Sequence, residues 1–124
     1  MSPLAETQTA APNAAVVTKA TIRAADRLDI SSRSLARVLG VSEATVSRMK
    51  KGDYALDKKP FELAVAFIRL YRSLDAIVGG DDSVAATWLK NQNTALAGRP
   101  IELIESVSGL TNVIQYLDAR RAII

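Results

Sequence analysis

The sequence predicts an all-α fold, and three observations support that prediction. Apolar residues recur at helical spacing along most of the chain, and no stretch has the strict alternation of a half-buried strand. Hydrophobic residues make up 48% of the chain but aromatic ones only 5%, so the core must consist mainly of Ala, Val, Leu and Ile. Glycines and prolines fall where helices would begin or end. At 124 residues, the chain forms one domain or two very small ones that share a core.

The composition also limits the chemistry that the protein can perform. The chain has no Cys and no His, which excludes disulfides and removes the usual ligands of zinc, copper and haem. It thereby also lacks the commonest general base and the commonest soft nucleophile. No phosphate-binding glycine-rich loop is present. We therefore expect no enzymatic activity, no cofactor and no metal.

Charge is distributed unevenly between the two halves of the chain. Residues 1–59 hold ten Lys and Arg against six Asp and Glu, whereas residues 60–124 hold six against seven. The basic half is the one that can meet an acidic polymer such as DNA. The N-terminus has neither the basic start nor the apolar run of an export signal, and the longest apolar stretch, residues 63–68, is too short to span a membrane. A cytoplasmic location is the expectation.

The first 28 residues divide into a segment without periodicity and a predicted helix. Residues 1–12 are rich in Ala, Thr and Pro without periodicity, which predicts a disordered lead-in. From residue 13 to residue 28 the periodicity predicts a helix, with Lys19, Arg23 and Arg27 facing outward. Its inward positions are Val17, Ala20, Ala24 and Leu28.

Two short helices follow, and each has a clear signal at both ends. They are predicted over residues 32–39 and from the residue after Ser42 to about Lys51. A serine before each helix can accept hydrogen bonds from free backbone N–H groups, and a glycine after each can adopt a left-handed conformation. The caps are Ser31 or Ser32 for the first helix and Ser42 for the second, and the stops are Gly40 and Gly52.

A long helix predicted from Pro60 to Val78 is apolar around most of its circumference. Such a helix is buried on more than one side, so we expect it to pack against the first three helices and against either the C-terminal part or a second subunit. It is a candidate dimer contact, and an ordinary central core helix is the alternative. Its apolar residues are Leu63, Ala64, Val65, Ala66, Phe67, Ile68, Leu70, Tyr71, Leu74 and Ile77.

Three further helices complete the predicted fold. Asp81 or Asp82 caps a helix that runs to about Asn91 and buries Val84, Trp88 and Leu89. After the loop NTALAGR, Pro100 begins a short helix, and Ser108 and Gly109 open the last one. That last helix has one apolar stripe, which consists of Leu110, Val113, Ile114 and Leu117.

The stretch SRSLARVLGVSEATVSRMKKG has the pattern of a DNA-binding helix-turn-helix. Ala36 is small where the two helices touch, Gly40 permits the turn, and the second helix is held by Val41, Val46 and Met49. The outward types suit base contacts, because Arg48 can bind guanine, Thr45 and Ser47 can reach base edges or phosphates, and Ala44 can meet a thymine methyl group. The candidate DNA-binding residues are Arg33 and Arg37 for phosphates, with Ser42, Glu43, Ala44, Thr45, Ser47, Arg48, Lys50 and Lys51.

An alternative interpretation applies to the basic end of this segment. Lys50 and Lys51 lie in the last turn of a helix, where the helix dipole alone favours cations, so they are equally typical of a solvated helix end. The combination of residues nevertheless closely resembles the helix-turn-helix of Xre and phage repressors over roughly residues 15–60.

Energetics favour a dimer on DNA. Two or three base contacts contribute roughly 1–3 kcal/mol each. Specific operators are usually bound about 4–10 kcal/mol more tightly than random DNA. One copy falls short of this difference, so we expect a homodimer on operator DNA with two half-sites related by two-fold symmetry.

The second half, WLKNQNTALAGRPIELIESVSGLTNVIQYLDARRAII, resembles the toxin-binding domain of Xre/MbcA/ParS antitoxins, whose partners are RES-domain toxins in type II toxin–antitoxin systems. Ala97 departs from the pattern, since many relatives carry a second glycine there. The positions that carry the resemblance are Trp88, Leu89, Asn93, Leu96, Gly98, Pro100, Leu103, Gly109, Val113 and Leu117.

This resemblance implies that the partner is a RES toxin, an enzyme that breaks down NAD⁺. It also implies that the protein binds this toxin and blocks the toxin's active-site cleft. The chain end YLDARRAII offers a physical route, because an apolar tail beside two arginines could fill a nucleotide pocket. A frayed helix end with solvated arginines is the alternative, and Trp88 is more often a core residue than an interface residue. The candidate toxin-binding residues are Trp88, Asn93, Leu96, Gly98, Arg99, Pro100, Leu103, Leu117, Arg120, Arg121, Ile123 and Ile124.

Two functional hypotheses follow. The leading one is an antitoxin with two activities, in which residues 13–59 repress its own operon and residues 60–124 bind the toxin. The alternative is a transcriptional repressor or partition-type DNA-binding factor whose C-terminal half only dimerises.

Overall fold

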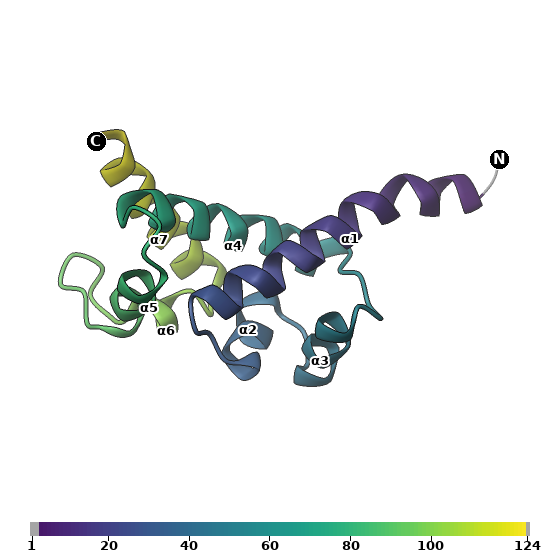
Figure 1. The fold of residues 1–124 in the computed structure, drawn as a ribbon, viewed down its shortest axis with the longest axis horizontal. Helices are drawn as coiled ribbons and strands as arrows, with labels where there is room; N and C mark the ends of the chain where they lie inside the picture. Colours follow the sequence, from purple (N-terminus) through teal and green to yellow (C-terminus); the bar gives the residue numbers. More distant parts are fainter. Residues whose placement is uncertain (1–2, 124) are drawn as a thin grey trace.

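The computed structural model describes the backbone of residues 3–123 and the side chains of residues 13–121 (Figure 1). Over this part of the chain there are helices and no strand, and the only bridge is an isolated one between Asn93 and Gly98. The predicted all-α class is confirmed. The helices are α1 (Pro3–Arg27), α2 (Ser32–Leu39), α3 (Glu43–Lys51), α4 (Lys58–Ile77), α5 (Asp82–Lys90), α6 (Pro100–Leu103) and α7 (Val107–Ile123).

The ends of α2 and α3 follow local rules. The Ser31 hydroxyl accepts a hydrogen bond from the N–H of Ser34 at 3.1 Å, and the Ser42 hydroxyl accepts one from the N–H of Thr45 at 3.0 Å. These bonds satisfy N–H groups that have no partner inside the helix. Gly40 and Gly52 end the two helices with φ of 70° and 81°, the left-handed region that glycine adopts without strain. The predicted caps and stops are confirmed, with Ser31 as the cap of α2.

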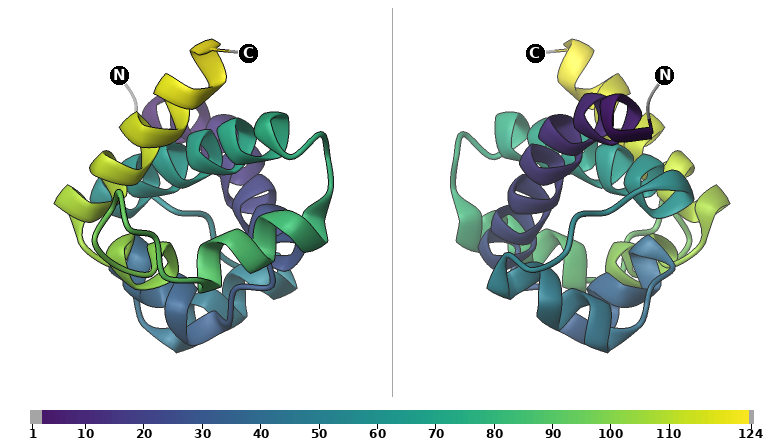
Figure 2. Two further views of the ribbon diagram at one scale, coloured as in Figure 1. Left: turned by 90° about the vertical axis from the view of Figure 1, so that its left-hand side faces the viewer. Right: turned by 90° about the vertical axis from the view of Figure 1, so that its right-hand side faces the viewer.

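Helix α4 is the central element of the fold, and it packs most extensively against α7 and α1 (Figure 2). Its buried side faces both halves of the chain through Phe67, Leu70 and Leu74. The expectation that this helix contacts both the first helices and the C-terminal part is confirmed. Burial around its circumference is incomplete, however, because Val65 is 46% exposed.

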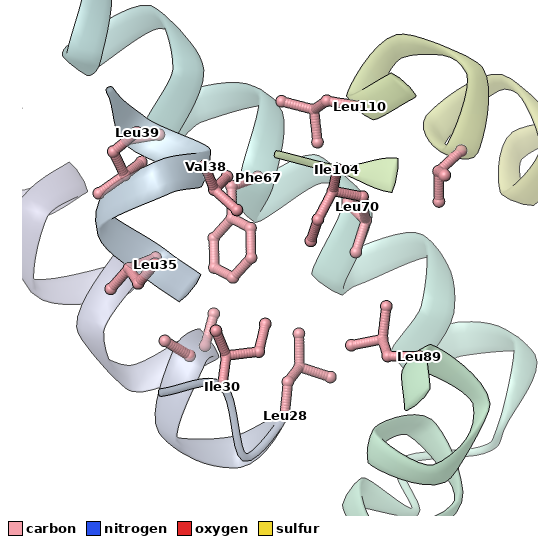
Figure 3. Packing of buried hydrophobic residues seen from close by; sticks show 14 of the residues in the cluster. Leu28, Ile30, Leu35, Val38, Leu39, Phe67, Leu70, Leu89, Ile104 and Leu110 are labelled. Carbon is pink, nitrogen blue, oxygen red and sulfur yellow. The ribbon is translucent and has the colours of Figure 1, made fainter. Parts of the chain in front are cut away.

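A single hydrophobic core extends through the helix-turn-helix and the C-terminal helices. Figure 3 shows Leu35 and Val38 of α2 beside Phe67 of α4, with Leu89 and Ile104 closing the core from the other half. Phe67 and Leu89 are fully buried. The two halves therefore stabilise each other through shared apolar contacts.

Helix α5 begins as predicted but buries different residues. The Asp81 carboxylate caps it by accepting a hydrogen bond from the N–H of Val84 at 3.2 Å. Ala85 and Leu89, four residues apart on one face, are buried, whereas Val84 is 50% exposed. The expected burial of Val84 was wrong, because its side chain lies about 100° around the helix from Ala85.

Helix α7 presents its apolar stripe to α4, with Leu110, Val113, Ile114 and Leu117 all buried. This part of the prediction is confirmed. The helix begins at Val107, slightly earlier than expected, and the cap is the Ser106 hydroxyl, which accepts a hydrogen bond from the N–H of Gly109 at 3.0 Å.

The first helix starts at Pro3, well before the expected residue 13. The prediction of a disordered lead-in falls on residues 1–12, whose side chains lie outside those described, and it stays a prediction. Among the described residues, no helix has the length and apolar character needed to cross a membrane.

Candidate functional site

Helix α3 is fixed to the body of the protein by its inward face and leaves its outward face accessible. Val46 and Met49 are buried, as is Ala36 of α2, the helix against which α3 packs, and this agrees with the predicted packing. The outward face is exposed, as expected for a helix that enters a DNA major groove. The exposed candidates on α3 and at its cap are Ser42, Glu43, Ala44, Ser47, Arg48, Lys50 and Lys51, and Arg33 and Arg37 are exposed on α2.

Thr45 is the exception among these candidates. It is only 9% exposed, and its hydroxyl lies 3.0 Å from the Ser42 hydroxyl. The expected outward orientation of Thr45 was wrong, because it shares the inward face of the helix with Val46 and Met49. Thr45 therefore helps to build the N-terminal end of α3 rather than to present a donor to a base.

The basic end of α3 is held by specific contacts. The Arg48 guanidinium lies 5.6 Å from the centre of the Tyr54 ring, a cation–π geometry. The Lys50 ammonium donates a hydrogen bond to the Ser32 hydroxyl at 2.6 Å, which joins α3 to the start of α2. Tyr54 was not among the candidate residues. Its only signal was an aromatic residue in the loop that follows the helix.

One candidate phosphate contact is already engaged by the other half of the chain. Arg37 on α2 forms an ion pair with Glu105, which follows α6, at 3.5 Å. A second ion pair, between Lys90 at the end of α5 and Asp29 after α1, also joins the two halves. The helix-turn-helix is thus tied to the C-terminal helices at its surface as well as through the core.

The loop between α5 and α6 is tightly folded. Backbone hydrogen bonds join Asn93 and Gly98 in both directions, at 2.9 and 3.2 Å, and the Asn93 side chain accepts from the N–H of Leu96 at 3.0 Å. Ala97 has a φ of 59°, in the region that favours glycine. The departure of Ala97 from the family pattern therefore falls at a position where a side chain is strained.

Glycines allow this loop and α7 to approach Leu103. A Cβ on Gly98 would lie 3.1 Å from the Leu103 side chain, and a Cβ on Gly109 would collide with the Leu103 carbonyl oxygen. The glycines at these two positions permit close packing of the loop and of the start of α7 around Leu103.

The candidate toxin-binding residues divide by exposure. Pro100 and Leu117 are buried and therefore support the structure rather than contact a partner. Arg99 is exposed, but its guanidinium bonds to the Lys90 carbonyl at 2.8 Å and to Glu102 at 3.0 Å. Trp88, Asn93, Leu96, Gly98 and Leu103 are half-buried, and Arg120 and Arg121 are exposed. The side chains of Ile123 and Ile124 lie outside the described residues.

Three side chains stack at the surface between α5 and α7. The Trp88 and Tyr116 rings are stacked with centres 6.3 Å apart and an interplanar angle of 19°. The Arg120 guanidinium lies 4.6 Å from the centre of the Tyr116 ring. This Trp88–Tyr116–Arg120 cluster combines a half-buried aromatic pair with an exposed cation, the composition of many protein-interface anchors. Tyr116 was not among the candidates, because its position relative to Trp88 depends on the fold.

On another side of α7, Asp118 is bound from α4. Its carboxylate accepts hydrogen bonds from the Ser73 hydroxyl at 2.7 Å and from the Arg69 guanidinium at 2.6 Å. The hydrogen bond from Ser73, with the charge of Arg69, holds the pKa of Asp118 below its ordinary value. Arg121 reaches the same Ser73 hydroxyl at 3.4 Å.

Comparison with protein families assigns both halves. Residues 10–69 match the antitoxin Xre-like helix-turn-helix domain, and residues 73–122 match the antitoxin Xre/MbcA/ParS C-terminal toxin-binding domain. The chain belongs to the Xre/MbcA/ParS antitoxin family. A search of curated proteins found no match. The Xre/MbcA/ParS antitoxin therefore combines a DNA-binding helix-turn-helix with a toxin-binding domain.

The two matched regions of the antitoxin meet inside α4, since one ends at residue 69 and the other begins at Ser73. Helix α4 thus belongs to both, and Ser73 is the α4 residue that binds Asp118 of α7. The sequence-based division at residue 59 stays a prediction.

Proposed function

We propose that this antitoxin represses transcription of its own operon through α2 and α3, and that it neutralises a RES-domain toxin through its second half. The toxin would degrade NAD⁺, and the antitoxin would block its active-site cleft. The observation that carries the proposal is the match of residues 73–122 to a toxin-binding domain, in the same chain as a complete helix-turn-helix. The proposed repression and toxin binding place the protein in the cytoplasm.

The accessible face of α3 supports the DNA-binding half of the proposal. Arg48 and Lys51 are exposed there, and the helix begins directly after Ser42, whose hydroxyl caps it. We assign Arg48 to a base edge and Lys51, with Arg33, to phosphates, since arginine matches guanine and lysine acts as a point charge. Lys50 is occupied by Ser32 and acts by holding α3 against α2.

The Trp88–Tyr116–Arg120 cluster supports the toxin-binding half. It lies beside a hollow of about 430 Å³ lined by Leu96, Leu103 and Tyr116. Half-buried apolar side chains can bury further surface area when a partner binds, and a neighbouring cation can orient that partner. We assign this surface to the rim of the toxin cleft, with the chain end beyond Arg121 directed into it.

A homodimer on a two-fold operator completes the proposal. It rests on the energetics of base contacts, since one α3 helix supplies less discrimination than a specific operator requires. The interpretation of residues 60–78 as the dimer contact stays a prediction. Arg69 and Arg72 lie one and two turns after the exposed Val65 on the same face of α4, so a two-fold axis there would bring like charges together.

The test is co-expression with the product of the adjacent gene. The expected result is a stable complex, together with a fall in cellular NAD⁺ when that product is expressed alone. Because Leu110, Val113 and Leu117 are buried in the core, the informative truncation removes only residues 122–124. That truncation, combined with Arg120→Ala, should abolish neutralisation and leave DNA binding unchanged.

The matched control is Lys59→Ala, which removes an exposed cation from the start of α4. Full neutralisation by the truncated Arg120→Ala variant would disprove the assigned route into the cleft. A co-purifying protein without any effect on NAD⁺ would disprove the RES assignment, while leaving the antitoxin family intact.

A further inference from the structure

The face of α4 opposite the core forms the floor of an open groove. Val65, Ile68, Arg69 and Arg72 follow each other at helical spacing on that face, on the side of α4 away from Phe67. Val65 and Ile68 contribute to the floor, and the two arginines contribute to its rim. Val16 of α1 closes one edge and Arg121 of α7 the other, and the groove has a volume of about 770 Å³. Figure 2 shows the first turns of α1 and the last turns of α7 on the side of the molecule opposite α2 and α3.

The floor of this groove is apolar and accessible. Val16 is 68% exposed and Val65 is 46% exposed, and both belong to the few large hydrophobic side chains that the described part of the chain leaves in solvent. A neighbouring hollow between α1 and α4 shares Val16, Ala20 and Ile68 with the groove, so the apolar floor continues along α1. Contiguous exposed apolar surface rimmed by polar residues is typical of a protein interaction site.

The rim of the groove is positively charged. Arg69 and Arg72 of α4, Lys19 and Arg23 of α1, and Arg121 of α7 surround the floor. Within the described residues, none of these cations except Arg69 has an ion pair. Among residues 13–121, Asp118 is the one carboxylate that lines the groove, and it is already bound by Ser73 and Arg69.

Toward Arg27 the surface also carries negative charge. The Arg27 guanidinium donates a hydrogen bond to the Tyr71 hydroxyl at 3.3 Å, and its pKa is raised, chiefly by that bond and further by the charges of Asp82 and Asp75. The two carboxylates offset part of the charge of Arg27, so the excess of positive charge lies between Arg23 and Arg121.

We propose that this groove binds an amphipathic α-helix of a protein partner, with apolar side chains on one face and Asp or Glu on its flanks. A helix fits a groove flanked by two helices by inserting residues i, i+3, i+4 and i+7 between them. Acidic flanks would pair with Arg72, Arg121 and Arg23, which have no ion pair with a carboxylate in the part of the chain that the structure describes.

Charge and shape favour this occupant over two others. A second copy related by a two-fold axis would place the same arginines opposite each other. DNA would leave Val16 and Val65 against phosphates and sugars, where apolar side chains gain little. The groove also differs from the proposed toxin surface, because Asp118 and Arg121 lie on a different side of α7 from Tyr116 and Arg120.

The experiment measures binding of a fluorescein-labelled helical peptide to the full-length antitoxin by fluorescence anisotropy. The peptide carries Leu at positions i, i+3, i+4 and i+7 and Glu on both flanks. One comparison peptide has the same composition in scrambled order, and another has Lys in place of Glu. Val65→Glu and Arg72→Glu alter the groove at exposed positions, and Val107→Glu is the matched control on an exposed valine at the start of α7.

The acidic peptide should bind, and both comparison peptides should bind about tenfold more weakly or worse. Val65→Glu and Arg72→Glu should each weaken binding of the acidic peptide by about tenfold, while Val107→Glu leaves it unchanged. Equal binding of the Lys peptide, no binding of the acidic one, or an equal effect of Val107→Glu would overturn the proposal.

Two further measurements on Val65→Glu separate the competing occupants. A fall in the sedimentation mass from that of a dimer to that of a monomer would assign the groove to a second copy. Loss of operator binding would assign the groove to DNA. Either result overturns the proposal. Unchanged mass and operator affinity support it. Toxin neutralisation measured on the same variant tests the proposed function separately, since that function places the toxin at the Trp88–Tyr116–Arg120 cluster.

Discussion

The guanidinium of Arg37 on the helix-turn-helix lies 3.5 Å from the carboxylate of Glu105, which belongs to the toxin-binding domain. The same arginine is a candidate for a DNA phosphate. Glu105 is the less exposed partner, with 25% of its side chain accessible against 54% for Arg37. If Arg37 binds a DNA phosphate, DNA and Glu105 compete for one cation, and this competition would link the surfaces of the two domains.

Glu105→Gln should free Arg37 for DNA. An exposed ion pair contributes at most about 1 kcal/mol, so we expect operator affinity to rise by roughly two- to fivefold. The slope of log affinity against log salt should become steeper by about one unit if Arg37 gains a full phosphate contact. Titrations of operator DNA at several salt concentrations measure both quantities. Glu102→Gln, whose carboxylate pairs with Arg99, is the control and should change neither.

Replacing Arg48 and Lys51 together with Ala should weaken operator binding. The loss of one base contact costs about 1–3 kcal/mol and the loss of one phosphate contact lowers the salt slope by about one unit. Neutralisation of the toxin should be unchanged, because both residues lie on the exposed face of α3. Binding titrations beside a toxin rescue assay provide the measurement. Loss of neutralisation along with DNA binding would contradict the division of roles between the domains.

Ala97→Gly should stabilise the protein. A left-handed conformation costs a non-glycine residue about 1–2 kcal/mol, and glycine removes this cost. Part of the stabilisation is lost again, because glycine raises the conformational entropy of the unfolded chain. The net expectation is about 0.5–1 kcal/mol, or roughly 2–5 °C in Tm. Thermal and urea unfolding measure it. Ala95→Gly, in the same loop at a residue without positive φ, should destabilise instead. Equal effects of the two substitutions would show that Ala97 is unstrained.

Asp118→Asn should reduce stability in a pH-dependent way. The pKa of Asp118 is lowered in the folded state, mainly by the Ser73 hydrogen bond and then by Arg69. Its stabilising contribution is therefore complete above the ordinary Asp pKa of about 3.9 and is lost as the pH falls below that value. We expect the variant to be about 1 kcal/mol less stable at pH 7, and this difference to shrink below about pH 4.

Urea unfolding followed by circular dichroism from pH 3 to pH 7 provides the test of Asp118. Asp53→Asn is the control, because Asp53 is exposed and has no ion pair among the described residues. A difference between wild type and Asp118→Asn that stays constant over the whole range would exclude the charge of Asp118 as its cause.

Much of the fold could be predicted because the deciding interactions are local. Ser42 caps α3 through a residue three positions away, and Gly40 ends α2 through its own backbone conformation. The periodicity of α7 identified its buried stripe for the same reason, since helical spacing alone places Leu110 and Leu117 on one face.

The errors and omissions arose where neighbours distant in sequence decide the outcome. Val84 and Ala85 are both apolar, and the position of the core alone determines that Ala85 is buried. The pairing of Arg37 with Glu105 and the stacking of Trp88 on Tyr116 join separate helices, so no spacing within the sequence indicates them. Thr45 had a polar side chain suited to DNA, but its place on the inward face of α3 engages it with Ser42.

Helix α4 contributes Phe67 and Leu74 to a core that serves both domains. Neither domain can open this core without exposing apolar surface of the other, so the chain is expected to unfold in one cooperative step. A cellular protease that cleaves the unfolded chain would then destroy DNA binding and toxin binding in the same event. If the antitoxin represses its own operon as proposed, release of the toxin and renewed transcription would begin together, with their timing set by a single unfolding equilibrium.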